Sequence, residues 1–129
     1  MAQMADKGMP PICPPLPENA VREDQGYAAV QDLIRDEIAF DGLFCANDFI
    51  ALGAMRALEE YNINIGQDVR VIGFDGIAMG AYAQPPLTTI EQDYVQAGEM
   101  LVEALIAVLK GETPSISPVP VRLLTRGTA

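Results

Sequence analysis

Helix-type and strand-type patterns alternate along most of the chain, and this alternation restricts the fold more than any other feature of the sequence. The predicted helices cover residues 24–38, 48–61 and 94–110, a loose helical turn covers 78–84, and the predicted strands are 43–46, 69–74, 87–90 and 119–125. Strands that are separated by helices form a parallel sheet with helices on both faces. We therefore expect an α/β fold with a three-layer, open, mostly parallel sheet.

The N-terminal 23 residues differ from the rest in composition. Five of the ten prolines fall within residues 9–17. Proline fixes φ and restricts the residue before it, so this stretch is forced to be extended. We interpret residues 1–23 as an extended, proline-rich connector, and a polyproline ligand for another domain is the alternative interpretation.

Charge and residue usage exclude several classes of protein. The formal net charge is −10 and the chain has no histidine. An acidic chain is repelled by nucleic acid backbones and anionic membranes, and a chain without histidine lacks Ser-His-Asp triads, Cys-His dyads and nearly all zinc sites. The first residues do not resemble a secretory signal, and no apolar run approaches the ~20 residues of a membrane span. We expect a cytoplasmic protein that binds no metal, cofactor or membrane.

Polar side chains follow two of the predicted strands directly. Asn47 and Asp48 come after strand 43–46, and Asp75 comes after strand 69–74. Ligands of open α/β sheets bind at this carboxyl edge, and Asn and Asp together can accept from and donate to vicinal hydroxyls of a sugar, polyol or ribose. The alternatives are structural, since Asn47 is a preferred helix cap and Asp75 begins an Asp-Gly turn.

Enzymatic activity has little support in the sequence. Paired carboxylates hydrolyse glycosides at suitable spacing, but no nucleophile or metal cluster accompanies them here. Cys45 lies in an apolar strand without a basic partner, which predicts a buried, unreactive thiol. No dinucleotide or Walker fingerprint is present. We expect no enzymatic activity.

Two predicted helices have too many apolar residues for a single buried stripe. Helix 48–61 has only Asp48, Arg56, Glu59 and Glu60 as charged residues, and helix 94–110 is similarly apolar. Such helices require cover on two sides. One cover of helix 48–61 is the sheet, and the other is a second subunit or a missing part of the chain. We therefore expect an obligate dimer, a truncated chain, or both.

Three blocks in sequence order resemble the lactose-repressor-type (LacI/GalR) family of transcription regulators. They are residues 44–58 (FCANDFIALGAMRAL), 68–75 (DVRVIGFD) and 85–92 (PPLTTIEQ), and the last strand, 121–126 (VRLLTR), also fits. The resemblance extends from about residue 26 to residue 128. Periplasmic sugar receptors for transport share the first two blocks, whereas the third favours the regulators.

The resemblance implies a two-lobed effector domain that follows a DNA-reading helix-turn-helix. A small molecule, often a sugar or nucleobase, binds between the lobes. By position, Asn47, Asp75 and Gln92 match effector-contacting residues. The helix that starts at Asp48 and the segment 75–86 match the dimer interface, for which the candidate residues are Phe49, Leu52, Met55 and Arg56. Helix 94–110 resembles one that packs on the other lobe.

The sequence departs from the family pattern because neither the helix-turn-helix nor the first lobe is present. We therefore expect residues 24–129 to form a partial C-terminal lobe of a periplasmic-binding-protein type I domain. Its expected partners are a small-molecule effector, most simply a sugar, and further copies of itself as a homodimer or higher oligomer, while DNA would be contacted only through the absent helix-turn-helix. The alternatives are a fragment of a periplasmic sugar-binding receptor and a stand-alone protein that dimerises without ligand.

Overall fold

The computed structural model describes residues 12–15, 21–115 and 117–129. Its elements are α2 (Arg22–Arg35), β1 (Gly42–Phe44), α3 (Asp48–Glu60), β2 (Arg70–Asp75), the 3-10 helix η1 (Ala78–Tyr82), β3 (Thr88–Gln92), α4 (Tyr94–Leu109) and β4 (Val121–Leu124). Their order is the predicted one. Most of the predicted connector, residues 1–11 and 16–20, lies outside the described residues, and α2 begins at Arg22, inside the predicted connector.

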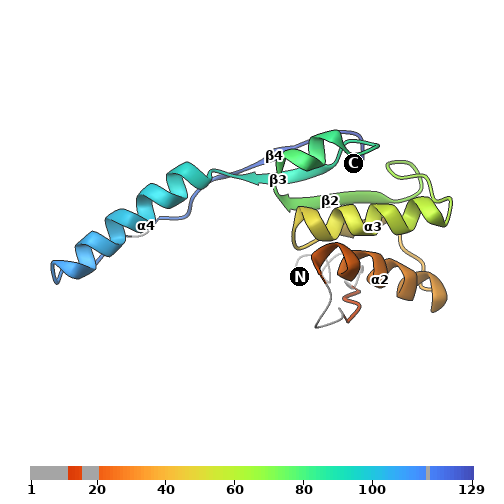
Figure 1. Ribbon diagram of the computed structural model, residues 1–129, viewed down its shortest axis with the longest axis horizontal. Coiled ribbons are helices and arrows are strands. Elements are labelled where there is room, and N and C mark those ends of the chain that lie inside the picture. The colour runs from red at the N-terminus through yellow and green to blue at the C-terminus, as the bar shows by residue number, and fades with distance from the viewer. Residues whose placement is uncertain (1–11, 16–20, 116) are drawn as a thin grey trace, which may run out of the picture.

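The four strands form one sheet in the order β1-β2-β3-β4. The pairs β1–β2 and β2–β3 are parallel, which confirms the mostly parallel sheet. Strand β4 pairs antiparallel with β3 because the chain leaves the sheet at the end of β3, runs outward along α4 and returns (Figure 1). The carboxyl ends of β1, β2 and β3 therefore meet at one edge of the sheet.

Helix α3 lies between the sheet and α2 (Figure 1). The two helices approach closely at two glycines, since a Cβ on Gly26 would overlap the Ile50 carbonyl oxygen and a Cβ on Gly53 would overlap that of Glu23. The second cover of α3 is thus α2 of the same chain. The expectation that this side requires a second subunit or a missing segment was wrong, because these glycines let α2 pack backbone against backbone.

The core lies between α3 and the sheet and is closed by the C-terminal residues. Leu58, Val71 and Leu87 are fully buried there. The Thr128 hydroxyl accepts from the Thr88 amide at 2.8 Å and donates to the Val71 carbonyl at 2.6 Å. The tail thereby joins β2 to β3 near their amino ends, opposite the edge at which ligands bind in such sheets.

Helix α4 projects away from the sheet, and none of its residues is buried (Figure 1). The sheet face opposite α3 is therefore not covered by α4 in the described part of the chain, where Phe44 and Leu123 are 67% and 57% exposed. The sequence predicted helices on both faces of the sheet, and α4 does not form the layer on this second face in the described structure. No helix among the described residues has the length and apolar character needed to cross a membrane.

Candidate ligand-binding site

Asp75 and Gln92 meet at the carboxyl ends of β2 and β3. The Gln92 side chain donates from Nε2 to Asp75 Oδ1 at 2.9 Å. The Tyr94 hydroxyl donates to the Asp75 carbonyl oxygen, also at 2.9 Å. The structure thus brings two of the three predicted site residues together. Tyr94 was not predicted as a site residue, because at the first position of an apolar helix it has no signal distinct from the helix itself.

The backbone at Asp75 is held in an unusual conformation. Asp75 has φ of 111° and Gly76 has φ of 77°. A Cβ on Gly76 would lie 2.9 Å from Glu91 Cα, so the turn passes close to β3. Asp75 is therefore a turn residue and also presents a carboxylate at the carboxyl edge of the sheet. The hydrogen bond from Gln92 uses Oδ1, and Oδ2 accepts none from the described residues.

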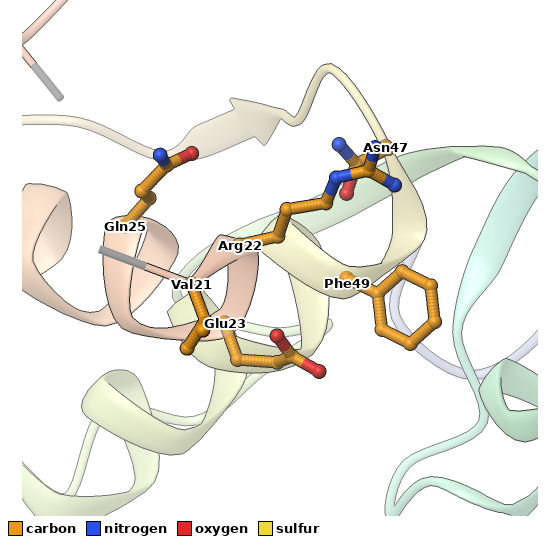
Figure 2. A pocket seen from close by; sticks show the side chains of 6 residues that line it. All are labelled: Val21, Arg22, Glu23, Gln25, Asn47 and Phe49. Atoms are coloured by element: carbon orange, nitrogen blue, oxygen red, sulfur yellow. The ribbon is translucent and has the colours of Figure 1, made fainter. Parts of the chain in front are cut away.

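Asn47 is the N-cap of α3, where its Oδ1 accepts from the Ile50 amide at 2.9 Å. It also lines an open cavity of about 510 Å³ (Figure 2), whose other lining residues are Val21, Arg22, Glu23, Gln25 and Phe49. The cap uses the side-chain oxygen and does not involve the Nδ2 donors. The two interpretations of Asn47 are therefore compatible.

Arg22 is a further candidate that the sequence analysis missed. Figure 2 shows its side chain reaching toward Asn47, with the Glu23 carboxylate turned away from both. The Arg22 guanidinium makes no hydrogen bond or ion pair with the described residues, whereas Arg35, Arg56 and Arg122 are paired with carboxylates. It was missed because it falls within the predicted connector, where nothing marks the start of a helix.

Asp48 is not exposed to a ligand. Its side chain is fully buried. Its Oδ2 accepts from the Ile77 amide at 2.7 Å, and its Oδ1 accepts from the Thr89 hydroxyl at 2.5 Å. Of the two polar residues that follow β1, only Asn47 therefore opens to the cavity.

The titratable groups near this edge offer no nucleophile. Burial, with a smaller contribution from the Asp48 charge, raises the pKa of Cys45 to about 12, so its thiol stays protonated at neutral pH. Partial burial followed by the charges of Asp75 and Asp48 also raises the pKa of Tyr94. In the segments that the structure describes, no cluster of three His, Cys, Asp or Glu side chains could hold a metal ion. The arrangement is suited to hydrogen bonding with a ligand.

The four predicted interface residues on α3 lie in different environments. Met55 is 5% exposed and belongs to the chain's own core, while Phe49 and Leu52 are half-buried. Arg56 pairs with Glu60 at 3.1 Å and lies 5.2 Å above the Tyr27 ring centre. Phe49, Leu52 and Arg56 are therefore the three candidates that still present surface.

A mostly parallel sheet with hydrogen-bonding side chains gathered at the carboxyl ends of its strands is the architecture of an α/β small-molecule-binding domain. The chain belongs to the periplasmic binding protein-like domain family, whose model matches residues 2–129. The solved structures that it resembles include a lac repressor dimer bound to operator and the anti-inducer ONPF. That structure is 29% identical with a TM-score of 0.86, and the match covers 98% of this chain and 38% of the other.

Similar sequences include the HTH-type transcriptional repressor PurR of Haemophilus influenzae (strain PittEE), 37% identical over 69% of this chain. The lactose operon repressor of Escherichia coli (strain K12) is 34% identical over 80% of the chain. The chain spans 26% of the length of the first and 29% of the second. Both relatives are repressors. The predicted resemblance to lactose-repressor-type regulators is therefore confirmed, and a regulator is favoured over the alternative of a transport receptor.

Proposed function

We propose that this chain is the effector-binding and dimerisation portion of a LacI-type transcription regulator, acting in the cytoplasm without enzymatic activity. The observation that carries the proposal is the pairing of Asp75 with Gln92 at the carboxyl edge of the sheet. In this proposal, operator DNA is contacted through a helix-turn-helix that these 129 residues do not contain.

The chemistry of this edge fits a sugar as the effector. The Asp75 Oδ2 is an acceptor, while the Asn47 amide and the Arg22 guanidinium supply donors. A sugar hydroxyl both donates and accepts, so adjacent hydroxyls can satisfy groups of both kinds. The half-exposed ring of Tyr94 adds apolar surface beside Asp75.

The proposed mechanism is linkage between effector binding and lobe arrangement. Strand β3 leads from Gln92 directly into α4, whose apolar residues are exposed and would pack on the other lobe. A ligand held by Asp75 and Gln92 therefore favours one arrangement of the two lobes over another. Such differential affinity biases the DNA-binding state of the regulator.

Titration of the chain with lactose and with D-ribose, followed by amide NMR, tests the proposal. Because only half of a cleft is present, we expect dissociation constants of about 1 mM, or roughly −4 kcal/mol. The amides that should shift are those of residues 22–25, 47–49, 75–77 and 92–94. Asp75→Ala should abolish these shifts, and Asp41→Ala, at an exposed aspartate near β1, should preserve them. If a sugar saturates the chain and the amides at these positions do not shift, the proposed site is contradicted.

We propose that the chain dimerises through the surface formed by the exposed side chains of α3 and η1. Met79 and Tyr82 of η1 are 58% and 84% exposed, and Leu52 of α3 is half-buried. Leu52→Lys should convert the dimer to monomer in sedimentation velocity because it places a charge in an apolar contact. Leu105→Lys on α4 is the matched control and should leave the dimer intact. A dimer that persists in Leu52→Lys would speak against this interface.

A further inference from the structure

The buried carboxylate of Asp48 lies where three segments meet, namely the start of α3, the loop after β2, and strand β3. Asp48 is the first residue of α3 and is fully buried. It accepts the Ile77 amide from the loop that follows β2 and the Thr89 hydroxyl from β3. No basic side chain in the described part of the chain pairs with it, and the donors that it accepts from are a backbone amide and a hydroxyl.

The strand beside Asp48 is adapted to this carboxylate. A Cβ on Gly73 of β2 would overlap Asp48 Oδ1. Glycine at this position therefore leaves the space in which the carboxylate reaches Thr89 on the next strand. Two hydrogen bonds thus join this one side chain to two separate segments, the loop at Ile77 and strand β3.

Both donors are close in sequence to the residues that would bind the ligand. Ile77 follows Asp75 by two residues, and Thr89 precedes Gln92 by three on β3. Asp75 has φ of 111°, a conformation that persists only where its surroundings enforce it. The Asp48 carboxylate anchors this loop to the strand that carries Gln92.

We propose that Asp48 is the positioning residue of the ligand site. It fixes the loop 75–77 against β3 so that the Asp75 carboxylate meets Gln92, and it joins that loop to the first turn of α3. This inference rests on the proposed function, because it concerns how the effector site is held. A ligand that moves Asp75 would act through this one carboxylate on the helix assigned to the dimer interface.

Neighbouring threonines on β3 provide a matched test. Thr89→Val removes the hydroxyl that binds Asp48, whereas Thr88→Val removes an equally buried hydroxyl whose partners are Ala129 and Arg126. Asp48→Asn keeps the size of the side chain and removes its charge. All three variants are compared with wild type at a temperature at which each is folded by circular dichroism.

The first readout needs no ligand. In Thr89→Val and Asp48→Asn, the Gln92 side-chain amide resonances should move, and the Ile77 amide should exchange with solvent about tenfold faster. In Thr88→Val these signals should match wild type, and changes should be confined to residues near 71 and 126–129. Unchanged Gln92 and Ile77 signals in Asp48→Asn, or equal changes in Thr88→Val, would overturn the positioning role.

Lactose and D-ribose titrations separate this inference from the proposed function. We expect the dissociation constant to rise about tenfold in Thr89→Val and Asp48→Asn and to stay at the wild-type value in Thr88→Val. If the sugars bind the two site variants as they bind wild type, the positioning role is wrong while the effector site stands. If wild type binds neither sugar and the Gln92 signals still move, the proposed function fails and the structural role of Asp48 is supported.

Discussion

Gln92 holds the Asp75 carboxylate across the ends of two neighbouring parallel strands, with Nε2 2.9 Å from Oδ1. The two residues are 17 positions apart in sequence. Their contact depends on the pairing of β2 with β3 in register, which places Asp75 opposite Glu91, one residue before Gln92. The orientation of one carboxylate is thus a direct consequence of the sheet topology.

The positive φ of Asp75, 111°, predicts a difference between two substitutions. Asp75→Gly and Asp75→Ala both remove the carboxylate, but only glycine adopts this backbone conformation without strain. We expect Asp75→Gly to be more stable than Asp75→Ala by about 1 kcal/mol in urea unfolding. Neither variant should respond to lactose. Equal stabilities would show that the Asp75 backbone is not strained.

The close crossing of α2 and α3 makes Gly53 intolerant of a side chain. A Cβ there would overlap the Glu23 carbonyl oxygen, and backbone cannot move aside cheaply. We expect Gly53→Ala to lower the free energy of unfolding by about 3 kcal/mol or more. Gly98→Ala on α4 is the control, because nothing lies within 4 Å of a Cβ there. In that variant alanine should stabilise the helix by about 0.5–1 kcal/mol. The helical content measured by circular dichroism should rise accordingly.

Substitutions of Asn47 separate its capping role from its proposed ligand contact. Asn47→Ala removes the acceptor for the Ile50 amide and should cost about 1 kcal/mol of unfolding free energy. Asn47→Asp preserves the cap but removes the amide donors. We expect Asn47→Asp to keep wild-type stability in urea and to lose affinity for lactose. Wild-type affinity in this variant would limit Asn47 to the cap.

Burial of Cys45 predicts a loss of stability at alkaline pH. Its pKa rises from 9.0 to about 12 in the folded chain. Between these values the unfolded chain has released the proton and the folded chain retains it, so stability falls as pH rises, by up to about 1.4 kcal/mol per pH unit. The free energy of unfolding, measured in urea at pH values of about 9 to 11, should fall less steeply with pH in Cys45→Ala than in the wild-type chain. Parallel slopes for the two proteins would contradict the buried, protonated thiol.

The order of helices and strands could be predicted from the sequence because apolar periodicity is a local signal. The position of Asp75 at the carboxyl edge could also be predicted, since it follows a strand directly, whereas Gln92 was named only through the resemblance to the regulator family, and its contact with Asp75 comes from the structure. The antiparallel pairing of β4 could not, because it depends on the path that the chain takes after α4.

The close packing of α2 on α3 was likewise hidden from the sequence. It depends on Gly26 and Gly53 facing each other across two helices, and a glycine within a helix carries no signal of what approaches it. The same limit applies to Met55, which the resemblance made a candidate interface residue and which the structure buries in the chain's own core. Arg22 was missed because the start of α2 has no side-chain cap to mark it.

The absence of buried residues in α4 has a consequence for any melting experiment. A lone helix of 16 residues is marginal in water, and none of the residues of this one is fully buried. Its amide protons should exchange through local fraying long before those of α3, so the chain contains two cooperative units. A far-ultraviolet melting curve would then sum a gradual helix–coil change and a sharp collapse of the core, and fitting it with one enthalpy would understate the cooperativity of the core.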